Sequence, residues 1–513
     1  MKVFCKIIIL SVGIISLSGC NHQNVSSGRA TVAGTFTDSI LGENVNSYAV
    51  ITFSVPNSIL GGMTDYQTTV KLDGSFTMDI PIVNPGYAAI NAKSKSYDGF
   101  VLLSPSETTH MDLSLTGTGK LNVHMIEGSE LKPEDLENIG NVNNKVREAF
   151  AEGRNSPKLT ISSTPKAYSD SMLIRMEKDL AIVYKDSILS KNHKKLLSDL
   201  LKQFYLNLIL SDYDNYMRLL YLNNNQKDEK KDKSEQFISQ HPDKSYYTFL
   251  QNFDLNNPPQ LNDIYYSKNL QIILSKPKLS IPSLGDTPIA DWLKEVKAIL
   301  SNLTGIDSGS FYDMLAAEAY INQFQDELKP LSDVQKENIQ NYFNNSSFVD
   351  ILFSENEKTL LRVQQIEKNK QSNVIVNETP SVIKGELVDA IVSKYKGKVV
   401  LVDFWATWCA PCIDAMNESR SLKNKFLNKN IVFVYITSAS TPEGLWTKTI
   451  QEIGGEHYYL TNKEWESIFN SKQYGFNGIP TYMLFDSNGV LKNKISSYPG
   501  NEKMQEMIER LLP

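Results

Sequence analysis

Cysteine is scarce in this chain, with four residues among 513. A secreted protein stapled by a disulfide framework has cysteines spread along its length, whereas here Cys409 and Cys412 lie three positions apart. Histidine is also rare, and the six histidines show no metal-ligand spacing. No glycine-rich phosphate loop occurs. We therefore expect neither a disulfide scaffold nor a metal site.

Positive charge is not in excess, and long apolar runs are missing. The 52 Lys and Arg residues against 58 Asp and Glu give a formal net charge of −6, so the composition does not favour nucleic-acid binding. No apolar run reaches the roughly 18 residues that a membrane-spanning helix needs. The hydrophobic share of 41% is enough to bury several cores. At about 150 residues per domain, the length predicts roughly three domains.

The N-terminus carries the pattern of an export signal. Two lysines precede the apolar stretch Ile7–Leu17, which is the charged and then apolar order of a signal peptide. The residues Leu17-Ser18-Gly19-Cys20 resemble the bacterial lipoprotein box. This resemblance implies that residues 1–19 are removed, that Cys20 is lipidated, and that residues 20–30 form a tether. The alternative is an ordinary signal peptide with an incidental cysteine.

The next two segments differ in the spacing of their apolar residues. Residues 31–125 contain short apolar alternations broken by turn residues, which predict a β-sandwich domain. Residues 126–370 have helical spacing and predict an all-α domain. One buried stripe there consists of Leu196, Leu197, Leu200, Leu201 and Phe204. The tyrosines of this segment, Tyr205 among them, suggest either core packing or a ligand groove, and the spacing favours core.

From residue 371 to 513 the pattern is that of an α/β domain. The apolar run 399–405 predicts a buried parallel strand, followed by a helix at 411–428 and alternating strands and helices. Asn488-Gly489 marks a hairpin between the last two strands. We expect a mixed sheet flanked by helices.

The pair Cys409 and Cys412 falls just after the buried strand, at the predicted start of a helix. The partial positive charge of a helix N-terminus favours a thiolate, so Cys409 is the expected nucleophile. Cys412 is the expected resolving thiol, which attacks the mixed disulfide formed by Cys409. Half of a zinc site would need two further ligands, and none is visible. A static disulfide is the other alternative, but we expect an exposed pair at a helix start, and such a pair is labile.

The string from Val402 to Cys412, VDFWATWCAPC, together with Gly478-Ile479-Pro480-Thr481, resembles the thioredoxin fold of exported TlpA/ResA-like thiol-disulfide oxidoreductases. The resemblance implies that Pro480 follows a cis bond and faces the cysteines. It also implies that substrate docks at Trp408, Ile479 and Thr481. Asp403 matches the buried acid that moves protons for the resolving cysteine.

One departure from the family lies after the second cysteine, where this chain has Ala415-Met416-Asn417 in place of a Glu-Met-Pro set. Without the proline, we expect a straighter helix.

The resemblance implies a lipid-anchored cell-envelope oxidoreductase that reduces protein disulfides, with no cofactor besides the Cys409–Cys412 disulfide. Exported proteins are the implied substrates, and a membrane thiol reductase is the implied electron donor. Asn21 is not the aspartate linked to inner-membrane retention, so the outer membrane facing the periplasm is favoured. The alternative function is a peptide- or protein-binding lipoprotein whose thioredoxin-like domain is an accessory or a redox sensor. The residues ahead of that domain resemble the β-sandwich and helical extension found ahead of thioredoxin-like domains in lipoproteins of Bacteroidetes.

Overall fold

The computed structural model describes residues 27–38, 50–92, 99–115, 121–128, 130–151, 164–211, 213, 217, 242–344, 346–381 and 387–512. These divide into two compact units. The first comprises residues up to 282 together with 293–316, and the second comprises 283–292 and 317–513. The predicted signal peptide, Cys20 and the start of the predicted tether lie outside the described residues.

Two sheets open the first unit. The four-stranded sheet has the order β4 (Ser75–Ile82), β1 (Gly28–Asp38), β7 (Thr108–Leu115), β8 (Leu121–Met125). The five-stranded sheet has the order β3 (Met63–Thr69), β2 (Val50–Pro56), β5 (Gly86–Ala92), β6 (Gly99–Leu103), β9 (Glu130–Leu131). All pairings are antiparallel except that of β1 with β7, which is parallel.

One hydrophobic core joins the inner faces of both sheets. Alternate residues of β7, Met111, Leu113 and Leu115, are buried, as the period of two in a strand requires. They share a cluster with Val32 of β1 and Phe53 of β2. Two sheets around one core agree in part with the predicted sandwich. Strand β1 begins inside the segment predicted as tether, so the tether prediction is too long at that end.

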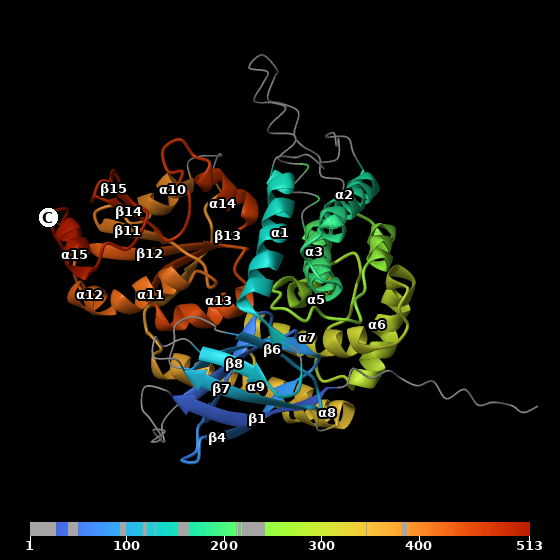
Figure 1. Ribbon diagram of the computed structural model, residues 1–513. Helices are drawn as coiled ribbons and strands as arrows, with labels where there is room; N and C mark the ends of the chain where they lie inside the picture. Colours follow the sequence, from blue (N-terminus) through green and yellow to red (C-terminus); the bar gives the residue numbers. More distant parts are fainter. Residues whose placement is uncertain are drawn as a thin grey trace, which may run out of the picture. The chain divides into compact units, whose positions relative to one another are not determined.

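Helices make up most of the rest of the first unit: α1 (Pro133–Ala151), α2 (Pro165–Lys185), α3 (Lys191–Ser211), η1 (Lys244–Asn252) and α5 (Tyr265–Ser275). Helices α1, α2 and α3 lie side by side (Figure 1). Helices α6 (Ile289–Thr304) and α7 (Ser310–Asp326) contribute residues to both units. The prediction of a purely helical segment from residue 126 is wrong at β9, because that strand completes the five-stranded sheet.

The second unit contains α8 (Asp333–Phe343), α9 (Ser347–Lys368) and a six-stranded mixed sheet. The strand order is β10 (Val374–Asn377), β13 (Gly455–Leu460), β12 (Ile431–Ser438), β11 (Val399–Phe404), β14 (Thr481–Phe485), β15 (Leu491–Ile495). Strands β10, β13, β12 and β11 run parallel, and β14 and β15 are antiparallel to their neighbours. The predicted mixed α/β sheet is confirmed.

Helices cover both faces of this sheet, and β11 shows how. All six of its residues are buried, which explains its unbroken apolar run. Val400, Val402 and Phe404 pack with α10 (Leu387–Ser393) and α14 (Asn462–Phe469). Val399 and Leu401 pack on the opposite face with α11 (Ala410–Glu418), α12 (Arg420–Lys425) and α15 (Asn501–Glu509). By alternation, Asp403 belongs to this second face.

The connection after β12 is also helical, with α13 (Glu443–Thr449) followed by η2 (Ile450–Glu452). The single helix expected over 411–428 is in fact α11 and α12, interrupted at Ser419. Strand β10 and helix α10 carried no clear pattern in the sequence. Over the described residues, no helix combines the length and apolar character needed to cross a membrane.

Candidate active site

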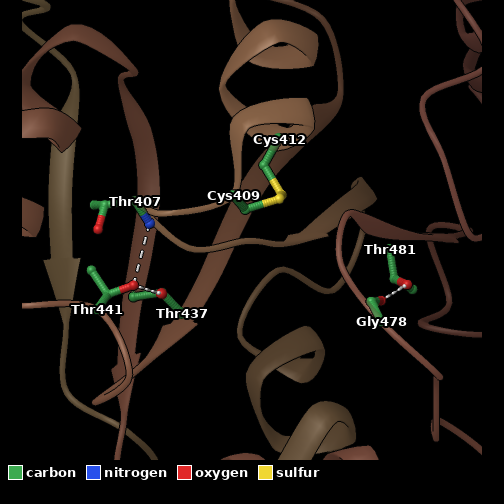
Figure 2. Close-up of a disulfide and its surroundings, with 7 residues drawn as sticks. All are labelled: Thr407, Cys409, Cys412, Thr437, Thr441, Gly478 and Thr481. Carbon is green, nitrogen blue, oxygen red and sulfur yellow. Dashed lines mark hydrogen bonds between the residues drawn. A yellow bond between two sulfur atoms is a disulfide. The ribbon is translucent and has the colours of Figure 1, made fainter. Parts of the chain in front are cut away.

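The two cysteines form a disulfide at the N-terminus of α11 (Figure 2). Cys409 is the N-cap residue, and its carbonyl accepts hydrogen bonds from the backbone N–H groups of Cys412 at 3.0 Å and Ile413 at 3.1 Å. The Cα atoms of Cys409 and Cys412 are 5.3 Å apart. This position exposes the Cys409 sulfur to the positive end of the helix, which favours its thiolate once the disulfide is reduced.

The disulfide is covered by protein. Cys412 is fully buried and Cys409 is 4% exposed, so the sequence-based view of an exposed pair is wrong. Both belong to a buried cluster with Trp405, Met416 and Tyr435. By contrast, Trp408 is 62% exposed beside Cys409. An exposed indole next to a nearly covered sulfur suits a docking surface.

The loop before β14 lies against this cluster. The Ile479–Pro480 peptide bond is cis, as the resemblance implied, and the half-buried Ile479 side chain packs on the cluster that contains the cysteines. The Thr481 hydroxyl donates to the Gly478 carbonyl at 2.7 Å (Figure 2). Because Thr481 is buried, its side chain is not available to a substrate, and docking at Trp408 and Ile479 stays a prediction.

Two threonines that sequence reasoning missed hold the loop between β11 and α11. The backbone N–H of Thr407 donates to the Thr441 hydroxyl at 3.3 Å, and that hydroxyl is 3.0 Å from the hydroxyl of Thr437 (Figure 2). Both threonine side chains are fully buried. Hydroxyls at this distance from the motif carry no signal in the sequence, because only the packing of β12 against β11 brings them together.

Asp403 lines a small cavity of about 20 Å³. Lys423 of α12 and three tyrosines, Tyr435, Tyr482 and Tyr498, line it as well. One Asp403 carboxylate oxygen, Oδ1, is buried without a hydrogen-bond partner. A cavity this size holds about one water molecule, so a water can satisfy Oδ1. Tyr435 belongs to both this cavity and the cysteine cluster.

Burial controls the charges around this cavity. It raises the pKa of Asp403 to about 8, and the nearby positive charge of Lys423 opposes that rise. Burial also lowers the pKa of Lys423 to about 8, against the attraction of Asp403. Although part of the Lys423 side chain is exposed, its ammonium group lies inside and donates to the Tyr435 hydroxyl at 2.9 Å. The pair thus holds exchangeable protons near neutral pH.

His457 lies next to this network. Its ring stacks on Tyr435 with centroids 5.1 Å apart, and its Nε2 is 3.1 Å from the Gly454 carbonyl oxygen. Burial lowers the pKa of His457 to about 4, so the ring is neutral at physiological pH. Over the described part of the chain, no group of three His, Cys, Asp or Glu side chains is placed to hold a metal ion.

A cysteine pair that begins a helix after the central parallel strand of a mixed sheet, opposite a cis-proline loop, defines a thioredoxin-like domain. A family model described as thioredoxin-like matches residues 397–491. The thioredoxin-like protein YneN of Bacillus subtilis is 30% identical over 151 residues, which cover 28% of this chain and 79% of that protein. By its C-terminal domain, the chain therefore belongs to the thioredoxin-like family.

Other relatives carry the name of an activity. The thiol-disulfide oxidoreductase ResA of Bacillus thuringiensis subsp. konkukian is 26% identical over 119 residues, which cover 23% of this chain and 66% of that protein. The chain thus spans just under two thirds of that relative. Among solved structures, a thiol:disulfide interchange protein of Chlorobium tepidum is 21% identical, with a TM-score of 0.22 and coverage of 24% of this chain and 84% of that chain.

Proposed function

We propose that the C-terminal domain is a thiol-disulfide oxidoreductase that reduces disulfides of exported proteins. The observation that carries this proposal is the Cys409–Cys412 disulfide at the N-terminus of α11, in one cluster with Ile479 of the cis-proline loop. Relatives named thiol-disulfide oxidoreductase support it.

The reaction begins from the reduced dithiol. The Cys409 thiolate attacks one sulfur of a substrate disulfide, whose S–S bond breaks, and the other substrate sulfur leaves as a thiolate that takes up a proton. Cys412 then loses its proton and attacks the Cys409 sulfur of the mixed disulfide. The second substrate thiolate leaves, so the substrate gains two electrons and the Cys409–Cys412 disulfide forms.

Asp403 is the proposed acceptor of the Cys412 proton, through the water that its cavity can hold. An ordinary thiol has a pKa of about 8.5, and burial places the pKa of Asp403 at about 8. Transfer between groups of matched pKa requires little free energy, which is the condition for efficient proton exchange. The 20 Å³ cavity leaves room for a water but not for a substrate.

The surroundings of the reaction are part of the proposal. The signal-like N-terminus and Cys20 support a lipid anchor in the cell envelope. The proposed substrates there are proteins that carry disulfides. An oxidising compartment returns the dithiol to the disulfide unless electrons are supplied. A membrane thiol reductase is therefore the proposed donor, with no cofactor besides the cysteine pair.

The test is reduction of insulin disulfides by the purified full-length chain with dithiothreitol as electron source. We expect catalysis by the wild type and its loss in Cys409→Ser, because no nucleophile remains. If wild type and variant are equally inactive, the oxidoreductase proposal fails and a binding role is favoured. In Cys412→Ser, mixed disulfides on Cys409 should accumulate, and their reversal by reductant on a gel identifies the substrates.

A further inference from the structure

A second concave site lies in the first unit, between α1, α3 and the start of α5. It is a cavity of about 640 Å³, which is within the range of small-molecule sites. Leu200 and Phe204, two members of the apolar stripe predicted on α3, are only half-buried and line this cavity. The stripe is therefore not wholly core, and part of it faces a space large enough for a ligand.

Aromatic rings from three helices line the cavity: Phe150 of α1, Phe204 and Tyr205 of α3, and Tyr265 at the start of α5. The ring centroids of Phe150 and Phe204 are 5.6 Å apart and those of Phe204 and Tyr265 are 5.7 Å apart, both edge to face. Ring faces attract cations. The ring of Phe150 already binds one cation of the protein, because the guanidinium carbon of Arg175 lies 3.6 Å from the ring centroid.

A carboxylate completes the lining. One oxygen of Asp263 accepts the Tyr265 backbone N–H at 2.9 Å and so holds the start of α5. The other oxygen, Oδ2, is buried and has no hydrogen-bond partner. A buried carboxylate oxygen without a partner is costly in free energy, and a ligand that donates to it removes that cost. Burial raises the pKa of Asp263 to about 6, so the carboxylate is ionised at pH 8.

The other charged groups at the cavity are already accommodated. Asp179 accepts a hydrogen bond from the Tyr205 hydroxyl and lies 3.9 Å from Arg175 Nε. Arg147 also lines the cavity but is exposed to water, so its charge is screened. Asp263 thus offers a ligand a negative charge, because its Oδ2 has no hydrogen-bond partner in the protein.

We propose that this cavity binds an organic cation, an ammonium or guanidinium group on an apolar body, with its charge at Asp263 Oδ2 and its body against Phe150, Phe204 and Tyr265. Two sources carry this chemistry: a free amine, and a lysine or arginine side chain of a peptide. The site does not depend on the redox chemistry proposed for the second unit.

Calorimetry on the full chain at pH 8 tests the proposal with two probes of similar shape, phenethylammonium and neutral 2-phenylethanol. We expect the cation to bind at least tenfold more tightly. Asp263→Asn should abolish that preference, because asparagine keeps the oxygen that holds α5 but has no charge. The matched control is Asp170→Asn, an exposed carboxylate of α2 paired with Lys166, which should keep the preference.

A peptide pair separates the two sources. Acetyl-Ala-Phe-Lys-Ala-amide is compared with the same peptide carrying norleucine in place of lysine. Binding of the lysine peptide alone, or of phenethylammonium alone, supports the cation site and names its source. The proposal is overturned if neither cation binds the wild type, or if charged and neutral probes bind equally. The comparison of charged and neutral probes uses the wild-type protein alone, so it tests the proposal even if Asp263→Asn does not fold.

Discussion

Burial raises the pKa of Asp403 from its ordinary 3.8 to about 8, so the folded protein binds a proton there more tightly than the unfolded chain does. The stabilising effect of that proton is complete below pH 3.8 and is lost as the pH rises through about 8. Asparagine does not titrate. We predict that the unfolding free energy of Asp403→Asn, minus that of the wild type, increases by about 1 kcal/mol per pH unit across this window.

Urea unfolding at pH 5, 6 and 7 measures this difference. The control is Asp414→Asn on α11, where the carboxylate is exposed, and its difference from the wild type should stay flat. A flat difference for Asp403→Asn as well would show that the carboxylate is not held in the protonated form by burial.

Lys423 acts on the same proton from a separate helix. Its positive charge lowers the pKa of Asp403 against the effect of burial. Replacing it by methionine keeps the length and removes the charge, so the pKa of Asp403 should rise further. Insulin reduction by Lys423→Met should therefore depend on pH differently from reduction by the wild type. We predict that the variant reaches half of its maximal rate at a higher pH.

The control for that shift is Lys425→Met. Lys425 is on the same helix, but it is exposed and bonds Gln505 Oε1 at 3.1 Å, away from Asp403. An equal shift in both variants would assign the effect to net charge. An unshifted profile in Lys423→Met would show that Asp403 does not limit the rate.

At the scale of single residues, the sequence predicted the groups that lie within one motif and missed those supplied from elsewhere. Cys409, Cys412 and Asp403 fall within ten positions of one another, and their chemistry depends on spacing along the chain. Lys423 and Thr441 reach the same site only because α12 and β12 pack beside β11. A surface-type residue such as lysine gives no sign in a sequence that its ammonium group will be enclosed.

The helices show how the segment predicted as one helix divides at Ser419 without a proline. The Ser419 hydroxyl donates to the Met416 carbonyl at 3.1 Å, a local bond that competes with helix geometry. The side-chain amide of Asn501, at the start of α15, donates to the Glu418 carbonyl at 2.9 Å. These contacts let α11 end at Glu418. Proline is one way to interrupt a helix, and these contacts are another, which no pattern along the chain indicates.

The loop from β11 to α11 depends on the Thr441 hydroxyl, which accepts the Thr407 N–H. Thr441→Val keeps the shape and leaves that N–H without its partner. We predict a loss of about 1–2 kcal/mol in unfolding free energy, with slower insulin reduction because the cysteine-bearing loop loses an attachment.

Thr449→Val provides the comparison for Thr441. Thr449 is also buried, and its hydroxyl donates to the Leu445 carbonyl of its own helix at 2.8 Å. It should leave the reduction rate unchanged. If both variants slow the reaction equally, the hydroxyl of Thr441 has no special part in positioning the loop.

At the scale of the whole molecule, composition and periodicity indicated several domains of different class. The predicted boundaries at residues 125 and 370 stay predictions, and the compact units divide the chain elsewhere, since residues 317–370 group with the thioredoxin-like sheet. Specific contacts explain that grouping. The Lys448 ammonium donates to the Leu328 carbonyl at 2.8 Å, and the Asn369 side-chain amide donates to the Glu452 carboxylate at 3.1 Å. A change in periodicity marks where helices stop and does not show what they pack against.

Glu452 makes the dependence on the preceding helix measurable. Its side chain is 4% exposed, and its carboxylate accepts from Arg362 of α9 and, at 3.1 Å, from Asn369. A fragment of residues 371–513 lacks both donors to Glu452, whereas a fragment of residues 347–513 keeps them. Because losing one partner of a buried ion pair strands the other charge, we predict that the shorter fragment is less stable by about 1–3 kcal/mol, a range reduced for the partial exposure of Arg362.

The substitution Glu452→Gln separates the stranded charge from a general loss of packing. In 347–513 it should lower the unfolding free energy, since it weakens the bond to Arg362. In 371–513 it should have no effect or raise the unfolding free energy, because it removes a charge that has lost both donors. Urea unfolding of the four proteins measures the coupling as a double-mutant cycle. If the substitution has the same effect in both fragments, α9 stabilises the thioredoxin-like sheet by apolar contact, and the ion pair is not what joins them.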